Sequence, residues 1–488
     1  MHRRNYTLHL TLAAALVVLA AAAGRIERWD WKRGGEPGGR GSAVVVRTSD
    51  EPPAPRETEA PEAEGVRDAE VLVRFKPGVS EERVEEIAAG LNDRVEDEIE
   101  SVEGLAAIDD LDDADAEAVA AQYASLPEVE YAEPNFRIEL DPRDVSYGRE
   151  SGGRFVAPLA AGPNDPRFSE QWGLANTGQR SGVAEADISA LAAWGKTKGS
   201  RKVVVAVLDS GVDYTHPDLA ANMWRRPADM EMYFDEQLGV VDDSDGFSAL
   251  AEERDPMDEN GHGTHCSGIV GAVGDNGLGI AGVNWQVEIM PLKFMNRRGF
   301  GSTKDAIEAI NYVIARRKDG VNVRVISASW GSPARSRALE DVIRKAGEAD
   351  ISFFAAAGND GADADKRPHF PSGYKLPNLV SVAALDRRDQ LAGFSNYGAK
   401  SVHLAAPGKE ILSTWLGGQY EEHSGTSMAT PFVAGVAALV LSVEPNLSVK
   451  ELRGRLFDSA DRLDALKGKV STGGRVNAAR AVGAVQIK

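Results

Sequence analysis

The feature that most constrains the fold of this chain is a set of five nearly continuous apolar runs, separated by stretches with helical spacing. Such runs are typical of parallel strands covered on both faces, because each face then has to be apolar. From about residue 165 onward the sequence therefore predicts an α/β domain, with helices layered on a mostly parallel central sheet. The runs are KVVVAVLDS (202–210), VEIMPLKFM (287–295), VRVISASWG (323–331), ISFFAAAGN (351–359) and LVSVAAL (379–385).

The segment from 69 to 136 has a different pattern, in which short strands and helices follow the order β-α-β-β-α-β. This order predicts a small α+β unit of the ferredoxin-like type over residues 67–140. The unit is acidic: it carries 22 acidic and 6 basic residues, whereas residues 141–488 contribute only −4 to the net charge of −20. No basic stripe is present, which argues against nucleic acid or an anionic membrane as the main partner.

The remaining segments read as export and connecting sequences. Residues 1–24 combine Arg3 and Arg4 with an apolar run and small residues, which predicts a signal peptide and a secreted or periplasmic protein. Retention of the run as a membrane anchor is the alternative. Residues 25–66, rich in Gly, Pro and Glu, predict a disordered linker, and 141–163 a connector. The single cysteine, Cys266, excludes an intrachain disulfide.

Four polar side chains stand at the ends of predicted strands or at the starts of predicted helices. Asp209 and Asn359 each follow an apolar run, and His262 and Ser427 each follow a glycine at a helix entry. Sites in open α/β sheets lie at the carboxyl ends of the strands, so these groups can meet there. Serine before an apolar run is also the ordinary sign of a helix cap, and alone Ser427 fits either role.

Together the four groups have complementary chemistry. A serine hydroxyl is a weak nucleophile and needs a base, which His262 can supply. A buried carboxylate at Asp209 can fix the imidazole tautomer and stabilise its charged form. The Asn359 amide can donate to the oxyanion that forms at the attacked carbonyl, beside the N–H at the helix start.

Four blocks around these residues carry a family resemblance. VLDSGVDYTHPDL, GHGTHCSG, AAAGN and GTSMATP resemble the signature blocks of the subtilisin-like serine proteases, in the same order, and the similarity runs from about Asn164 to Ala484. It implies a three-layer subtilisin-like peptidase domain (164–488) that cleaves peptide bonds through an acyl-enzyme, with Asp209, His262, Ser427 and Asn359 as catalytic residues. An α/β-hydrolase does not fit, because Ala429 replaces the last glycine of G-x-S-x-G. A catalytically silent binding or scaffold protein with this fold is the alternative.

The resemblance also implies residues that bind an extended peptide. One edge of the cleft would add the substrate as a strand, the opposite edge would form a pocket wall, and His369 would lie near the pocket floor. We expect an apolar or aromatic residue before the cleaved bond. Ordinary core packing is the alternative for Phe300 and Trp330. The edge residues are Gly299, Phe300 and Gly301 on one side and Ser329, Trp330 and Gly331 on the other.

A structural Ca²⁺ site is implied by similarity to thermitase-like members of the family, with a surface turn as the alternative. Its oxygen ligands, the type that calcium prefers, would be the side chains of Asp165, Asp218 and Asn276 and the backbone carbonyls of Val273, Leu278 and Ile280. The stretch VDDSDGFSALAEERD (241–255) is only partly like an EF-hand loop, because Val241 stands at its first ligand position, and a solvated loop is expected there. His265 and Cys266 are expected to be packing residues.

The acidic unit at 67–140 resembles the propeptide of these proteases, whose family role is to assist folding and then to occupy the cleft. The expected partners are therefore protein or peptide substrates and the chain's own propeptide. Self-cleavage is expected between Phe136 and Asn164, in the exposed connector at 141–163. The chain would then be a secreted zymogen that activates itself.

Overall fold

The computed structural model describes residues 70–112, 114–140, 162–235 and 238–485, all of which belong to one compact unit. The predicted signal peptide (1–24) and linker (25–66) lie outside the described residues, as does nearly all of the connector at 141–163. The boundaries assigned to these segments therefore stay predictions.

The N-terminal sheet has the predicted ferredoxin-like order. Its four strands are antiparallel, in the spatial order β2-β3-β1-β4. Val71 and Val73 pack with the two helices on one face, whereas Leu72 belongs to the apolar core of the larger domain. Both faces of this sheet are thus covered. The elements are β1 (Glu70–Phe75), α2 (Glu81–Gly90), β2 (Asp93–Glu98), β3 (Leu105–Asp110), α3 (Ala116–Ala124) and β4 (Val129–Pro134).

The large domain is built on a nine-stranded sheet, in the order β18-β19-β15-β14-β13-β12-β6-β10-β9. Neighbouring strands are parallel except for the β18–β19 pair at one edge. The five apolar runs form β6, β10, β12, β13 and β14, which confirms the predicted parallel sheet. The strands are β6 (Gly199–Asp209), β9 (Phe247–Ser248), β10 (Gln286–Lys293), β12 (Val323–Ala328), β13 (Ser352–Ala356), β14 (Leu379–Leu385), β15 (Leu404–Pro407), β18 (Asp461–Arg462) and β19 (Gly474–Arg475).

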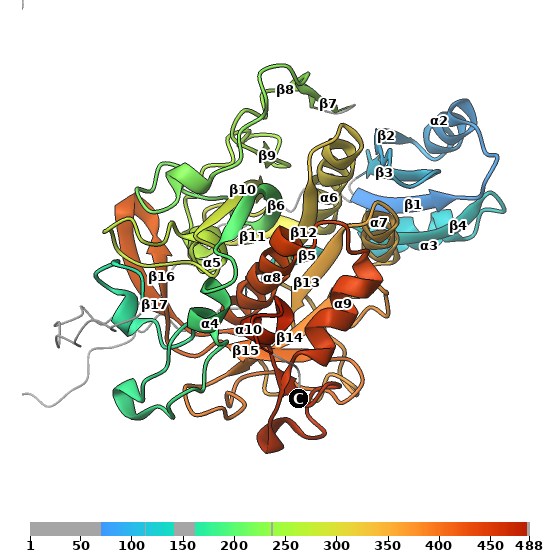
Figure 1. The fold of residues 1–488 in the computed structure, drawn as a ribbon. Helices are drawn as coiled ribbons and strands as arrows, with labels where there is room; N and C mark the ends of the chain where they lie inside the picture. Colours follow the sequence, from blue (N-terminus) through green and yellow to red (C-terminus); the bar gives the residue numbers. More distant parts are fainter. Residues whose placement is uncertain (1–69, 113, 141–161, 236–237, 486–488) are drawn as a thin grey trace, which may run out of the picture. The chain divides into compact units, whose positions relative to one another are not determined.

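Helices cover both faces of this sheet (Figure 1). Along β6, residues 203, 205 and 207 pack into the core that contains α5 and α8, and residues 204, 206 and 208 pack into the core that contains α6 and α7. This double burial is the reason the runs show no polar alternation. The helices are α4 (Ala190–Trp194), α5 (His262–Gly271), α6 (Thr303–Lys318), α7 (Arg337–Glu348), α8 (Thr426–Val443), α9 (Val449–Asp458) and α10 (Ala478–Ala481).

Helix α8 runs through the centre of the domain. Among the described residues it alone has the length and apolarity of a membrane-crossing helix, but 89% of it is buried inside the protein. It contacts β6, β12, β13, β14 and β15 and lies against α5. A core helix of a globular domain explains both its composition and its burial.

Three short pairs of antiparallel strands were not predicted. They join β7 (Tyr233–Asp235) to β8 (Gly239–Val241), β16 (Ile411–Trp415) to β17 (Gln419–His423), and β5 (Arg137–Glu139) to β11 (Phe300–Ser302). In each, strands of three to five residues pair, and runs so short carry little periodicity.

The prediction of a solvated loop at 241–255 is wrong at Asp243, which is fully buried. Its carboxylate accepts hydrogen bonds from Arg316 (2.6 and 2.9 Å) and Tyr312 (2.8 Å) and pairs with Arg226 at 2.9 Å. Two guanidinium groups neutralise the carboxylate, which is how a buried charge is tolerated without a metal ion.

Candidate active site

The end of β6 and the start of α5 bring a carboxylate and an imidazole into contact. Asp209, the last residue of β6, is fully buried, and His262 is the first residue of α5. His262 Nδ1 lies 2.7 Å from Asp209 Oδ1. The two elements approach so closely that a Cβ at Gly263 would lie 2.1 Å from the Gly211 carbonyl oxygen, which explains the glycine there.

A residue that the sequence analysis missed, Asp258, holds the start of α5 in place. Its Oδ1 accepts from the Gly261 amide (3.0 Å) and the Ser210 hydroxyl (2.9 Å), and its Oδ2 accepts from the Thr264 amide (2.9 Å). Burial raises the pKa of this carboxyl, against the effect of its hydrogen bonds. The Asp-x-Asn-Gly pattern before the helix was the available signal, since Asp and Asn favour such turns.

Ser427 lies within the first turn of α8 and does not cap the helix. The helix begins at Thr426, the capping position is Gly425, and no side chain caps it. The helix-cap interpretation of Ser427 is therefore wrong. Ser427 Oγ donates to the Ser329 carbonyl oxygen (2.9 Å), and Ser329 Oγ donates to the Ser427 carbonyl oxygen (2.8 Å). These bonds tie the start of α8 to the end of β12.

The Cys266 thiol shows that the histidine and the serine lie together. Its Sγ is 4.0 Å from His262 Nδ1 and 3.6 Å from the Ser427 carbonyl oxygen. The thiol is fully buried, and burial raises its pKa, so it is a neutral packing group. The starts of α5 and α8 therefore meet at the edge of the sheet where β6 ends.

His265 points away from this cluster, into the domain. Its Nε2 lies 3.1 Å from the carbonyl oxygens of both Ile411 and Glu421. Burial lowers the pKa of the His265 imidazole well below its ordinary value. His265 is therefore a buried packing residue, as expected.

Asn359 follows β13 and contacts the residue that precedes Ser427. Its Oδ1 accepts from the Thr426 amide (2.8 Å) and the Thr426 hydroxyl (3.0 Å). These bonds fix the amide oxygen, so the amide nitrogen is the donor end of the side chain. The four predicted groups thus come from β6, α5, α8 and the segment after β13, and all meet at the carboxyl edge of the sheet.

A strand from the N-terminal unit lies between the two predicted substrate-binding segments. In β5, Glu139, Ile138 and Arg137 pair with Phe300, Gly301 and Ser302 respectively. The Leu140 amide donates to the Gly299 carbonyl oxygen (2.9 Å), and Glu139 also bridges to Gly331. Residues 137–140 are therefore bound as an extended peptide that adds a strand on both sides.

The two aromatic residues predicted in this cleft behave differently. The Trp330 indole packs into the core, 4.8 Å from the Phe294 ring centre, and donates to the Leu208 carbonyl oxygen (3.0 Å). The predicted pocket wall is therefore wrong for the Trp330 side chain, because the ring faces inward. Phe300 is half-buried at the strand edge and lies 3.8 Å from the Arg137 guanidinium.

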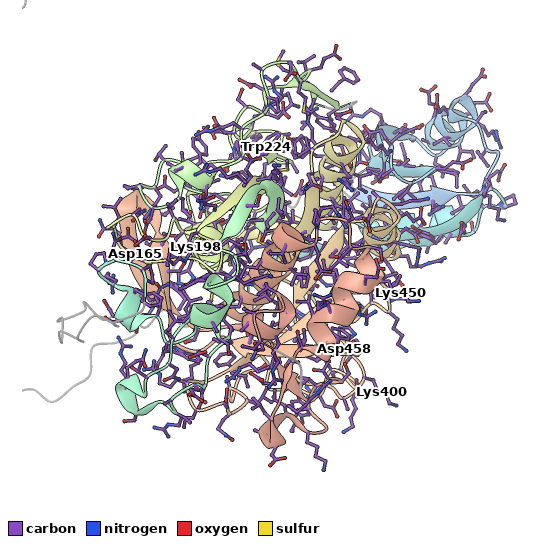
Figure 2. The ribbon with its side chains drawn as sticks, in the orientation of Figure 1. Asp165, Lys198, Trp224, Lys400, Lys450 and Asp458 are labelled. Atoms are coloured by element: carbon purple, nitrogen blue, oxygen red, sulfur yellow. The ribbon has the colours of Figure 1, made fainter. Side chains whose placement is uncertain are left out.

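The predicted calcium ligands come together beside the 273–280 loop. Asp165, labelled in Figure 2, accepts from the Asp275 and Asn276 amides at 2.8 and 3.1 Å. Asp218 accepts from the Ile280 amide (2.9 Å), and the Val273 amide donates to its carbonyl oxygen. Both carboxylates are buried.

The charge and side-chain orientations at this loop decide how well it suits a cation. Burial raises the pKa of Asp165, and the nearby Asp218 charge raises it further. Two neighbouring buried carboxylates fit a hard cation, which would relieve this repulsion. The Asn276 amide nitrogen, however, donates to Asp218 Oδ1 (2.7 Å) and its oxygen accepts from the Leu278 amide. A bound calcium ion would require this amide to turn.

Known protein families match two parts of the chain. The subtilase family profile matches residues 200–484, and the fervidolysin N-terminal prodomain profile matches residues 51–135. These regions contain the large sheet with its four clustered groups and most of the small N-terminal sheet.

Individual relatives extend this similarity. A thermophilic serine proteinase of Bacillus sp. (strain AK1) is 33% identical over 421 residues, which cover 85% of this chain and 87% of that protein. Thermitase of Thermoactinomyces vulgaris is 34% identical over 66% of this chain and 99% of its own length. Subtilisin-like protease 2 of Plasmodium falciparum is 36% identical over 50% of this chain, which spans only 17% of that protein.

Proposed function

The chain belongs to the subtilase family and is a serine endopeptidase with an N-terminal prodomain, and from this premise we propose how its residues act. Ser427 is the nucleophile, His262 its general base, and Asp209 the carboxylate that orients the base. The single observation that carries these roles is the 2.7 Å contact between His262 Nδ1 and Asp209 Oδ1, at the point where α5 and α8 meet.

The contact sets the tautomer of the imidazole. With Nδ1–H donating to Asp209, the lone pair is on Nε2 and can accept the Ser427 proton. The hydroxyl, which here donates to Ser329, has to rotate toward the ring. Its oxygen then attacks the peptide carbonyl, His262 passes the proton to the leaving amine, and the acyl-enzyme is hydrolysed by water activated in the same way.

The negative oxygen formed in this attack needs donors in place. Asn359 is suited to this role, because its amide oxygen is held by Thr426 and its nitrogen is the donor end. The Ser427 amide, at the positive end of the α8 dipole, is the second donor. Preorganised donors of this kind stabilise the transition state more than the substrate.

The prodomain strand supports autoinhibition and self-processing. Residues 137–140 occupy the position of the acyl side of a substrate, since they pair with Phe300 on one side and with Gly331 on the other. A bound strand of this kind excludes other peptides. We place the processing cut within 141–163, and the product is an exported enzyme freed from the signal at 1–24.

The first test compares the wild-type chain with Ser427→Ala. The variant should lose about 10⁵-fold or more in kcat, because the nucleophile is absent, as loss of this serine costs in subtilisin itself. Mass measurement should find the variant near full length and the wild type shortened by its prodomain. Ser442→Ala, at the far end of α8, is the matched control and should be processed normally.

A fluorophosphonate probe separates this proposal from a catalytically silent scaffold, because it labels only an activated serine. Wild type and Ser442→Ala should be labelled, and Ser427→Ala should not. Normal processing of Ser427→Ala would contradict self-cleavage, and absence of labelling in the processed wild type would contradict the assigned nucleophile.

We also propose calcium at the 273–280 loop, held by Asp165, Asp218 and Asn276 with the carbonyl groups of Val273, Leu278 and Ile280. The ion would fasten the loop to the segment around Asp165. A ligand at 1,000 times its Kd stabilises the folded state by about 4 kcal/mol. Chelation should therefore lower the Tm of the Ser427→Ala chain by several degrees.

Asp218→Asn tests this calcium assignment directly. The variant should have a lower Tm in calcium and should respond little to chelation. Asp363→Asn, in an exposed loop where Asp363 pairs with Lys366 (2.9 Å), is the control and should respond like the parent chain. A Tm that chelation leaves unchanged in the parent would exclude a stabilising calcium site.

A further inference from the structure

The side chain of His369 lies between two glycines that border the catalytic serine. A Cβ on Gly331 would lie 2.0 Å from His369 Cε1, and a Cβ on Gly358 would lie 3.1 Å from its Cγ and Cδ2. The imidazole therefore fills the space between these two backbone segments. It is half-buried, so one part of the ring remains accessible.

Both glycine segments are tied directly to the start of α8. The Ser329 carbonyl oxygen, two residues before Gly331, accepts from Ser427 Oγ (2.9 Å). The Gly358 amide donates to Thr426 Oγ1 (3.1 Å). The ring thus lies between two backbone segments that both contact the start of α8, and we call the space between these segments the slot.

The register of the bound strand identifies the substrate residue that meets this slot. Glu139 lies opposite Gly331, and in an antiparallel ladder the peptide residue two positions later falls opposite Ser329. That residue brings its carbonyl group to Ser427 and is the one before the cleaved bond. In the sequence, Asp141 follows Glu139 by two positions, and its placement lies outside the described residues.

Two acidic groups on the same loop are engaged with other partners, and His369 Nδ1 lies 3.4 Å from Ser372 Oγ. Asp363 pairs with Lys366 (2.9 Å), and Asp365 accepts from the Ser401 hydroxyl (2.7 Å) and amide (2.9 Å). Both carboxylates are therefore engaged within their own loop region. An imidazole donates an N–H to a carboxylate in its neutral form and adds a positive charge when it is protonated.

We propose that His369 determines specificity and that the enzyme favours an acidic residue, aspartate or glutamate, immediately before the cleaved bond. This inference rests on the proposed function and departs from the apolar or aromatic preference expected from the sequence. Two observations carry it: a hydrogen-bond donor stands at the floor of the slot, and the ring takes up space that a large aromatic side chain needs. The chain's own Asp141 has the matching chemistry.

The test uses the processed enzyme and peptides Ile-Glu-Leu-X carrying a fluorogenic amine, where X is Asp, Glu, Asn or Phe. The first three residues copy residues 138–140 of the bound strand. We expect kcat/KM for Asp or Glu to exceed that for Asn by about tenfold or more, because a charge-assisted hydrogen bond is roughly twice as strong as a neutral one. Comparing Asp with Glu at position X shows which side-chain length reaches the His369 ring.

Three variants assign the preference to this side chain. His369→Ala should bring the Asp-to-Asn ratio close to one and raise the relative rate with Phe, because the floor opens. His369→Gln keeps an N–H donor without charge and should give an intermediate ratio. Arg367→Ala removes an exposed cation two residues away and should leave the ratio as in the wild type.

The outcomes separate this inference from the proposed function. Fluorophosphonate titration counts the active sites in every variant. A misfolded variant is thereby recognised, and each rate is divided by the concentration of active sites. Suppose that titration finds intact active sites, that the wild type prefers Phe, and that His369→Ala keeps this preference. The specificity assignment is then wrong, and the protease mechanism still stands. Absence of titration in the wild type overturns both.

Discussion

The interior of the catalytic domain and the interface with the prodomain bury their surfaces with different chemistry. Around α8 the interior is apolar: every residue from Thr426 to Leu441 is buried, and most are Ala, Val or Leu. The interface combines apolar side chains, such as Leu72 of the prodomain sheet, with buried charges. Lys304 of α6 lies 3.0 Å from Glu96 and 3.7 Å from both Glu70 and Asp97 of the prodomain.

The interface charges are strongly perturbed by their surroundings. Burial raises the pKa of Glu70 to about 8 and that of Asp97 to about 7, against the effect of the Lys304 charge. Burial alone would lower the pKa of Lys304, but the surrounding carboxylates raise it above its ordinary value. The two carboxyl groups and the Lys304 ammonium group therefore lie in a poorly hydrated site. Contact with water would remove the cost of burying their charges.

The difference shows which surface is permanent and which can separate. Exposing the α8 core to water would cost the full hydrophobic contribution, about 25 cal/mol for each Å² of apolar surface. Exposing the ionic interface returns hydration to each charge, which offsets much of the lost attraction. A prodomain that leaves after the proposed processing would be better held by the second kind of contact.

The largest effect is expected from a cavity in the interior. Leu439→Ala, in the fully buried part of α8, should lower the free energy of unfolding by about 2–5 kcal/mol, because the packed helix cannot collapse around the missing atoms. Denaturant unfolding of the Ser427→Ala chain measures this without self-digestion. Val240→Ala, at a side chain that is 59% exposed, is the control and should change the value by less than about 0.5 kcal/mol.

If Leu439→Ala lowered the free energy of unfolding by less than about 1 kcal/mol, the contrast between the interior and the interface would be wrong for the interior. It would mean that the α8 core is loosely packed and no more permanent than the interface. A loss that varied strongly with pH would have the same consequence, because the side chains that form the cluster around α8 are apolar.

The parts of the fold that followed from sequence are those in which local pattern decides burial. The runs that became β6, β10, β12, β13 and β14 have both faces covered, so periodicity alone identified them. Contacts between distant segments were not predictable in this way. Asp243 is buried because Arg316 neutralises it from 73 positions further along the chain.

The residues of the candidate site also differ in how far the sequence could predict their positions. Asp209, His262, Asn359 and Ser427 stand at strand ends and helix starts, which topology brings to one edge, so their clustering was predictable. The inward turn of the Trp330 ring and the five-bond role of Asp258 depend on exact side-chain packing. The pairing of β5 with β11 joins segments some 160 residues apart, and three-residue strands give no signal of it.

The second effect concerns a prodomain carboxylate at the start of α7. Glu133 accepts from the Ser336 hydroxyl (2.5 Å), the Arg337 amide (2.8 Å) and the Ala338 amide (3.1 Å). Glu133→Ala should weaken prodomain binding by about 1–3 kcal/mol, or roughly 5- to 150-fold, because buried donors lose their acceptor. Dissociation of the prodomain from a Ser427→Ala chain nicked in the connector measures the loss.

Glu130→Ala is the matched control for this interface contact. Glu130 is 44% exposed and pairs with Arg337 at 3.5 Å and with Arg74 at 3.8 Å, so water screens both pairs. Its removal should change the affinity by about 1 kcal/mol or less. Equal losses in both variants would show that the interface is held by its general charge balance and not by the Glu133 contact.

The smallest effect at any single pH is expected from the carboxylates around Lys304. In the complex the pKa of Glu70 is about 8 and that of Asp97 about 7, against ordinary values of 4.5 and 3.8. The complex then binds more protons than the separated parts, so prodomain affinity is highest below about pH 4 and falls as the pH rises toward 8. Each released proton contributes at most tenfold per pH unit within that window.

Neutral variants distinguish this titration from general acid sensitivity. Asp97→Asn and Glu70→Gln imitate the protonated groups, so each should flatten the fall of affinity between pH 5 and 8 and bind more tightly than the parent at pH 8. Glu86→Gln, whose side chain is 60% exposed on α2, should keep the parent profile. A parent profile that is flat, or that rises toward pH 8, would mean that Lys304 neutralises the cluster completely, and the interface would then be as insensitive to pH as the apolar interior.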